Sequence, residues 1–92
     1  MEVAFYATLR PIVGAKTVDI ATAEGATVRE LVEAIVAQHP ALGSILLNEA
    51  GAVPRGVHVF VNGRGAGYLT RGFETPLAAD DTIDVFPAVA GG

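Results

Sequence analysis

The sequence predicts an α+β fold in which one main helix lies across a mixed sheet of four to five strands. Four short segments alternate between two faces at the period of two that is typical of strands; they are residues 2–9, 17–21, 57–61 and 82–86. One segment, residues 28–36, repeats its apolar positions at helical spacing. A single amphipathic helix needs one sheet face to cover it, and 92 residues are enough for one domain. Two layers therefore account for the whole chain.

The first two strands are predicted to form a hairpin. Pro11 interrupts the first run because proline cannot donate a hydrogen bond to a sheet, and Gly14 permits the turn that follows. Two strands joined by a short turn are typical of a hairpin. The side chains expected to face inward are Val3, Phe5, Ala7, Val18 and Ile20.

The main helix has a defined start and end. Thr27 followed by Glu30 has the spacing of a capping box, in which each side chain satisfies a free backbone N–H of the first turn. Pro40 stops the helix near His39, because the residue before a proline avoids the helical conformation. The apolar face expected to pack on the sheet consists of Val28, Leu31, Val32, Ile35 and Val36.

The second half of the chain supplies the remaining strands. Residues 40–54 are less regular and contain one short helical turn. The strand at 57–61 points its three valines to one face and its His and Phe side chains to the other. Asn62-Gly63 is the favoured pair for a tight hairpin turn, since both central positions need a positive φ. Further strands are expected at residues 68–70 and 82–86.

This order of elements favours a two-layer roll of the ubiquitin-like, or β-grasp, type. Its first and last strands are parallel neighbours in the middle of the sheet, and the hairpin and helix connections lie outside them. We expect a β-grasp domain over residues 1–86 and a flexible carboxyl-terminal Gly-Gly tail over residues 87–92.

The composition argues against several classes of protein. With 51% apolar and 17% charged residues, the chain is too apolar for a disordered protein. A net charge of −4 argues against a nucleic-acid binder, which normally carries a basic excess. The start lacks the basic region of a signal peptide, and no apolar run approaches the ~20 residues of a membrane span. The absence of cysteine fits a cytoplasmic protein, which is the localisation we expect.

The usual catalytic and metal-binding constellations are missing from the sequence. His39 and His58 are the only histidines, and they lack the ligand spacing of a metal site. The Asp80-Asp81 pair is ordinary turn chemistry. The glycine-rich loop at residues 63–67 lacks the Lys-Ser/Thr pair and the following helix of a phosphate loop. We therefore expect this chain to bind no metal and no cofactor.

The tail is the remaining candidate for a functional site. It follows a predicted central strand, so its origin is rigid, and it carries no charge after Phe86, so it can enter a narrow apolar channel. Gly91 and Gly92 have no Cβ, which lets a partner close tightly around the terminal carboxylate. The extended residues from Pro87 onward reach roughly 20 Å, far enough to place that carboxylate in another protein's active site.

Motifs distributed over nearly the whole chain resemble those of one family. They are Phe5-Tyr6-Ala7-Thr8-Leu9-Arg10, Gly25-Ala26-Thr27-Val28-Arg29-Glu30-Leu31, Val59-Phe60-Val61-Asn62-Gly63-Arg64, Thr75-Pro76-Leu77, Ile83-Asp84-Val85-Phe86-Pro87 and the final Ala90-Gly91-Gly92. In this order, the motifs resemble the MoaD/ThiS group of ubiquitin-like sulfur carriers, and most closely its MoaD branch. MoaD is the small, sulfur-carrier subunit of molybdopterin synthase.

The resemblance implies a reaction at the carboxyl terminus. An E1-like, MoeB-like adenylating enzyme would use ATP and Mg²⁺ to adenylate the carboxyl group of Gly92, and a sulfur donor protein would convert it to a thiocarboxylate. The tail would then enter a MoaE-like large subunit of molybdopterin synthase and deliver sulfur to cyclic pyranopterin monophosphate in molybdenum cofactor biosynthesis. The chain would perform no catalysis alone.

The resemblance also assigns roles to individual residues. Gly92 would carry the reactive group, and Gly91 and Ala90 would let the tail pass through a narrow channel. Arg10 and Arg64 are candidates for polar contacts at the rim of a docking surface. The residues expected to dock on partners through apolar contacts are Phe86, Pro87, Val89, Phe60 and Tyr6.

Three other functions fit the sequence. The chain could carry sulfur to a different acceptor, in thiamin thiazole synthesis or tRNA thiolation, although the long segment at residues 40–54 is more similar to MoaD than to the thiazole carriers. It could instead be a ubiquitin-like modifier that forms isopeptide bonds through Gly92, because the activation step is shared. A plain binding domain with a passive tail is the third alternative.

Overall fold

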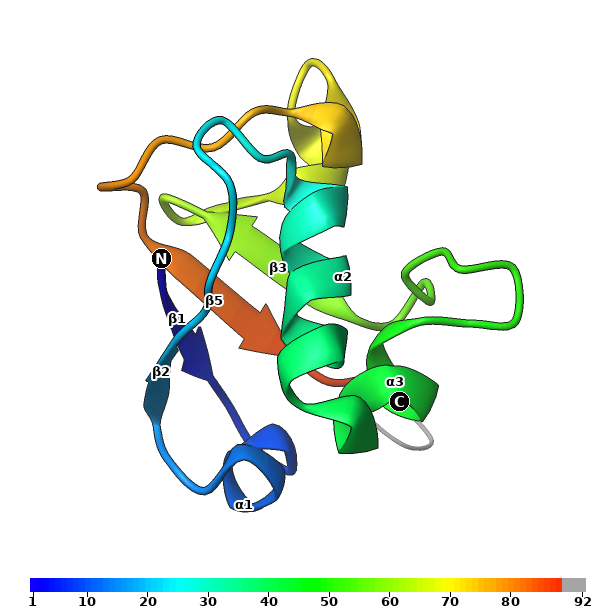
Figure 1. Ribbon diagram of the computed structural model, residues 1–92. Coiled ribbons are helices and arrows are strands. Elements are labelled where there is room, and N and C mark those ends of the chain that lie inside the picture. Colours follow the sequence, from blue (N-terminus) through cyan, green and yellow to red (C-terminus); the bar gives the residue numbers. More distant parts are fainter. Residues whose placement is uncertain (89–92) are drawn as a thin grey trace.

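The computed structural model describes residues 1–88, which form a five-stranded sheet with the main helix across one face (Figure 1). The strands lie in the order β2-β1-β5-β3-β4. β1 and β5 are parallel neighbours in the middle, and the other pairs are antiparallel. The predicted β-grasp roll is therefore confirmed. The strands are β1 (Glu2–Phe5), β2 (Thr17–Asp19), β3 (His58–Val61), β4 (Arg64–Gly65) and β5 (Ile83–Phe86).

Helix α2 (Val28–Gln38) covers the sheet and begins and ends where the sequence predicts (Figure 1). The Thr27 hydroxyl accepts from the backbone N–H of Glu30 at 3.2 Å, and the Glu30 carboxylate accepts from the backbone N–H of Thr27 at 2.9 Å. The capping box is thus complete. The shorter helices are α1 (Leu9–Val13), η1 (Pro40–Leu42), α3 (Gly43–Leu46), η2 (Ala66–Tyr68) and η3 (Gly72–Glu74).

The core lies between α2 and one face of the sheet. Leu31 and Ile35 from the helix are fully buried, as are Phe5 and Val85 from the two central strands. Among the described residues no charged or polar residue is fully buried. In the same part of the chain, no helix is long and apolar enough to cross a membrane.

The first predicted strand is too long, and the connection after it contains a helix that the sequence analysis missed. β1 ends at Phe5, and Ala7, predicted to face inward, is exposed with a positive φ of 53°. Leu9 is fully buried and begins α1. Pro11 lies in the first turn of this helix, where a backbone N–H has no partner within the helix, so proline is tolerated there. Gly14 ends α1 with φ 81°, the left-handed conformation that closes many helices.

The predicted return strand at residues 68–70 is also wrong. Asn62 and Gly63 have φ values of 53° and 82°, as the predicted tight turn requires. Because this turn contains only two residues, the chain pairs with β3 again at once, and β4 is formed by Arg64 and Gly65. Residues 66–68 instead form the 3₁₀ helix η2.

An exposed ion pair joins α2 to η3. The Arg29 side chain donates to both carboxylate oxygens of Glu74, at 2.7 and 3.2 Å. The hydrogen bond from Arg29 lowers the pKa of Glu74 and raises the pKa of Arg29. The Arg29 guanidinium also lies 3.4 Å from Glu33 in the next turn of the helix. This network holds the loop that precedes β5 against the helix.

Candidate functional site

The strand β5 connects the middle of the sheet to the tail. Its residues alternate, so that Ile83 and Val85 are buried in the core while Asp84 and Phe86 are half-buried on the opposite face. Pro87 is buried and Ala88 is exposed. Because Pro87 has no N–H to donate, the pairing of β5 with its neighbours ends with Phe86. The tail thus starts from a strand that is fixed on both sides.

Three of the predicted docking residues lie together on the sheet face opposite α2. The ring of Phe86 is stacked on Tyr6, with centroids 4.2 Å apart and an interplanar angle of 7°. Phe60 meets Phe86 edge to face, with centroids 5.5 Å apart. We call Tyr6, Phe86 and Phe60 the aromatic row. It runs across β5 and β3 from the residue that follows β1, and it lies beside the point where the tail begins.

Polar groups fix the Tyr6 end of the aromatic row. The Tyr6 hydroxyl donates to the Asp84 carboxylate at 2.8 Å, and this hydrogen bond raises the pKa of Tyr6. The guanidinium of Arg10 lies over the Tyr6 ring, 4.9 Å from its centroid, while Arg10 Nε donates to the backbone carbonyl of Phe5 at 2.7 Å. Cation–π contact and hydrogen bond together place Arg10 at the edge of the row. Asp84 was not predicted, although strand alternation puts it on the same face as Phe86.

Tyr68 extends the aromatic surface and was also missed. Its side chain is 89% exposed, which is unusual for so large a ring. An added Cβ on Gly65 would lie 3.2 Å from the Tyr68 ring and 3.9 Å from the Phe60 ring. Tyr68 therefore lies across Gly65, next to the Phe60 end of the row. The sequence signal for this exposed ring is an isolated aromatic residue beside glycines, a pattern that also fits a short strand.

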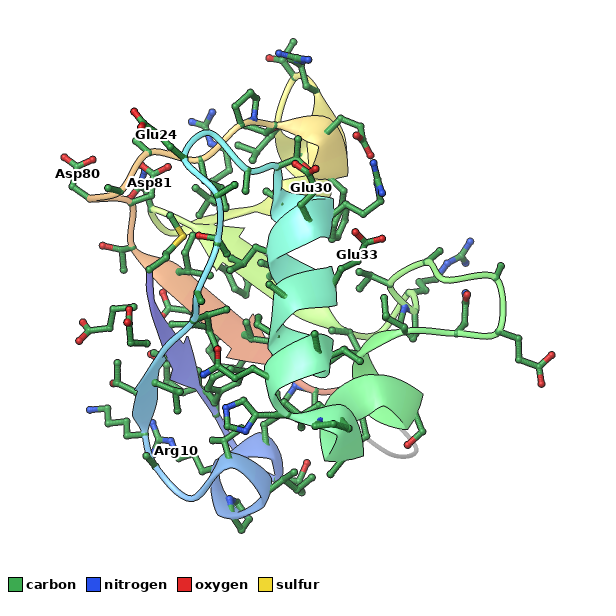
Figure 2. The ribbon with its side chains drawn as sticks, viewed as in Figure 1. Arg10, Glu24, Glu30, Glu33, Asp80 and Asp81 are labelled. Atoms are coloured by element: carbon green, nitrogen blue, oxygen red, sulfur yellow. The ribbon has the colours of Figure 1, made fainter. Side chains whose placement is uncertain are left out.

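The charges near the sheet are distributed unevenly. Figure 2 shows Arg10 at the α1 end of the molecule and Glu24, Asp80 and Asp81 gathered at the opposite end. Since β5 follows Asp80 and Asp81 and runs away from them toward α3, the tail begins far from this acidic end (Figure 1). The described start of the tail, Pro87 and Ala88, is therefore separated from the carboxylates of the acidic end (Figure 1).

The other candidate features do not form a chemical site in the part of the chain that is described. No group of three or more His, Asp or Glu side chains among residues 1–88 is arranged to hold a metal ion. A surface cavity of about 610 Å³ lies between Met1 and residues 22–26 and 77–79, and none of the described docking residues lines it. Val89, Ala90, Gly91 and Gly92 lie outside the described residues, so the roles predicted for them stay predictions.

Comparison with known proteins identifies the family. The sequence profile of the ThiS family matches residues 3–92. The chain belongs to this family of ubiquitin-like sulfur carriers. It is also similar over its full length to two proteins of Haloferax volcanii. Small archaeal modifier protein 3 is 37% identical and is covered to 98% of its length. Small archaeal modifier protein 1 is 35% identical and is covered to 100% of its length.

Several solved structures show the same fold. The crystal structure of SAMP1 from Haloferax volcanii matches with a TM-score of 0.85 and 33% identity, covering 100% of this chain and 98% of that one. The Amycolatopsis orientalis BexX/CysO complex gives 0.78 and 30%, covering 99% and 98%. A candidate molybdopterin converting factor subunit 1 from Pyrococcus furiosus gives 0.73 and 31%, covering 96% and 95%. The predicted resemblance and fold are thus confirmed.

Proposed function

We propose that this chain is a sulfur carrier whose reactive group is the carboxyl of Gly92, taken as the end of the mature protein. The observation that supports the proposal most is the position of Phe86, which belongs to the aromatic row and is also the last residue of β5. A partner that docks on the row therefore lies beside the start of the uncharged tail. Membership of the ThiS family supports the same chemistry.

Activation of the tail has to come from a partner enzyme. A carboxylate is a poor electrophile, so an E1-like adenylating enzyme, using ATP and Mg²⁺, first forms the acyl-adenylate at Gly92. A sulfur donor protein then supplies the sulfur that displaces AMP and leaves a thiocarboxylate. The described residues of this chain supply rigidity and a docking face to these steps, and the catalytic groups belong to the enzymes.

For the acceptor, we propose cyclic pyranopterin monophosphate, with this chain as the small subunit of molybdopterin synthase. The likeness to the Pyrococcus furiosus protein at 31% identity supports this role. The large, MoaE-like subunit then receives the tail and holds the pterin. Reconstitution tests the role: the thiocarboxylated chain plus a MoaE-like subunit should convert the pterin to molybdopterin, and the unmodified chain should not.

Conjugation to other proteins is a second candidate function, because both full-length relatives are named as modifiers. In that case the acyl carbon of Gly92 forms an isopeptide bond with a lysine amine of a target. Lys16 is the only lysine of this chain. The α-amine of Met1 donates to the Asp19 carboxylate at 3.0 Å and to the carbonyl of Ile20 at 2.8 Å, which holds it against the chain. Self-conjugates, if they form, should therefore be linked through Lys16.

Mass spectrometry of lysates from the native host distinguishes the two functions. A carrier appears as the free chain with a thiocarboxylate end. A modifier appears after trypsin cleavage as the carboxyl-terminal peptide of this chain, residues 72–92, joined to lysines of other proteins, because Arg71 is the last basic residue. A Lys16→Arg variant should keep both signals and lose only self-conjugates. If neither form is found while the activating enzyme is present, both functions are excluded.

A further inference from the structure

The start of the tail passes unusually close to Gly56. A Cβ added to Gly56 would lie 2.8 Å from the Cβ and 3.4 Å from the Cα of Ala88. Cβ atoms do not approach each other to 2.8 Å in proteins, so one of the two residues would have to move. Gly56 does not have a positive φ that would exclude alanine. An alanine at position 56 would therefore clash with Ala88, although the backbone conformation at this position allows alanine.

The contact follows from the register of the sheet. β3 and β5 are antiparallel with His58 opposite Phe86, so continuing the same register by two residues puts Gly56 opposite Ala88. Directly opposite residues of paired strands normally keep their Cβ atoms about 4.5–5.5 Å apart. Here Pro87 ends the hydrogen-bonded ladder, and a Cβ on Gly56 would come closer to the Cβ of Ala88 than paired strands with side chains allow. Only a residue without a Cβ fits opposite Ala88 in this arrangement.

We propose that Gly56 is a positioning residue that sets the path of the tail as it leaves β5. This role rests on the proposed function, because it matters only if Gly92 has to reach a partner's active site. In this role, Ala88, which is exposed and follows the last pair of β5, is the residue that shifts when position 56 is alanine, while Phe86 stays fixed in the aromatic row. The docking face is thus unchanged and the direction of the tail differs.

A shift at Ala88 changes where the end of the tail can reach. Inside a partner's channel the tail has to extend, and its last four residues then span at most about 13–14 Å, so a displacement of Ala88 displaces the carboxyl of Gly92 from the adenylating site. A misplacement of about 1 Å in a reacting group can lower a rate by roughly 100-fold. The structure therefore predicts an effect on the rate of activation and none on docking.

Three variants test the role: Gly56→Ala, Ala88→Gly, and the double variant. They are assayed as substrates of the host's E1-like adenylating enzyme in ATP–pyrophosphate exchange. For Gly56→Ala we expect kcat to fall by roughly 10- to 100-fold with KM for the carrier unchanged. In the double variant, the new Cβ faces only the Cα of residue 88 at 3.4 Å, an ordinary contact, so kcat should recover. Ala88→Gly alone should retain most of the wild-type kcat.

The outcomes are distinguishable. If the wild-type chain is activated and Gly56→Ala has the same kcat, or if the double variant is no better than Gly56→Ala, the positioning role is wrong and the proposed function stands. If the wild-type chain is not activated at all, the proposed function is wrong and the positioning role fails with it. Thermal unfolding is the control for folding: all three variants should keep a near wild-type Tm, because only an exposed residue beyond the sheet has to move. Loss of folding in Gly56→Ala would also overturn the proposal.

Discussion

Replacing Phe86 with leucine removes its ring and keeps most of its apolar bulk, which isolates what the aromatic row contributes to stability. Two ring pairs are lost, the stack on Tyr6 at 4.2 Å and the edge contact with Phe60 at 5.5 Å. Aromatic pairs contribute about 0.5–1.5 kcal/mol each beyond their buried area, so the free energy of unfolding should fall by about 1–3 kcal/mol. Each kcal/mol lowers the Tm of a domain of this size by roughly 4–8 °C.

A double-mutant cycle measures the stacking term directly. Urea unfolding of Tyr6→Leu, Phe86→Leu and the double variant should give a coupling energy of about 0.5–1.5 kcal/mol between the two rings. Tyr6→Phe is the matched control, because it keeps the ring and removes only the hydrogen bond to Asp84. Its coupling to Phe86 should be retained. A coupling energy indistinguishable from zero between Tyr6 and Phe86 would mean that the rings act as independent apolar groups and that the stack does not stabilise the fold.

Four further outcomes are expected. Thr27→Ala removes one half of the capping box and should cost about 1 kcal/mol in urea unfolding, whereas Thr70→Ala, at an exposed threonine outside any helix or strand, should cost little. Gly63→Ala should cost about 1 kcal/mol by the same measurement, because its φ of 82° is left-handed; no loss would mean that the turn relaxes. Because the pKa of Glu74 is lowered, its pair with Arg29 stabilises the fold at neutral pH, and this stabilisation is lost as the pH falls through that pKa. The free energies of unfolding of wild type and Glu74→Gln should therefore differ at neutral pH and converge in acid, and a difference that stays constant with pH would contradict this. Deletion of Gly92 should abolish adenylation and leave the Tm unchanged, and a loss of folding would contradict a tail that acts only as a substrate.

Much of the fold could be predicted because its signals are local. The capping box at Thr27, the apolar stripe of α2 and the Asn62-Gly63 turn each depend on residues that are close in sequence, and all three are confirmed. The parallel central strands belong to the β-grasp roll, which the order of elements favoured without excluding other α+β topologies. The core of the molecule was thus accessible from the sequence.

The errors in the fold arise where tertiary packing overrides the local pattern. Residues 2–9 alternate like one long strand, but burial of Leu9 in the core turns the chain at Ala7 and allows α1 to form. The return strand was placed at residues 68–70 because Tyr68 and its neighbours have strand-forming side chains. Because the turn at 62–63 has only two residues, Arg64 and Gly65 already pair with β3, and Tyr68 lies beyond this pair and is exposed.

The candidate site could be predicted only in part. Strand alternation put Phe60, Phe86 and Tyr6 on one face, and the structure brings the three rings into contact. The roles of Asp84 and Gly56 depend on the register of the sheet, that is, on which residues lie opposite each other in neighbouring strands. An alternating pattern within one strand does not determine this register. Long-range pairing is therefore what the sequence analysis lacked.

Whether Gly92 carries sulfur can be read from the intact mass of the protein isolated from its native host. We expect a fraction of the chain to be heavier by the replacement of one oxygen by sulfur, with the change confined to the carboxyl-terminal fragment. The variant without Gly92, produced in the same host, should not show this form. If only the unmodified mass is found in the wild-type chain while its activating enzyme and a sulfur source are present, Gly92 is not a sulfur carrier.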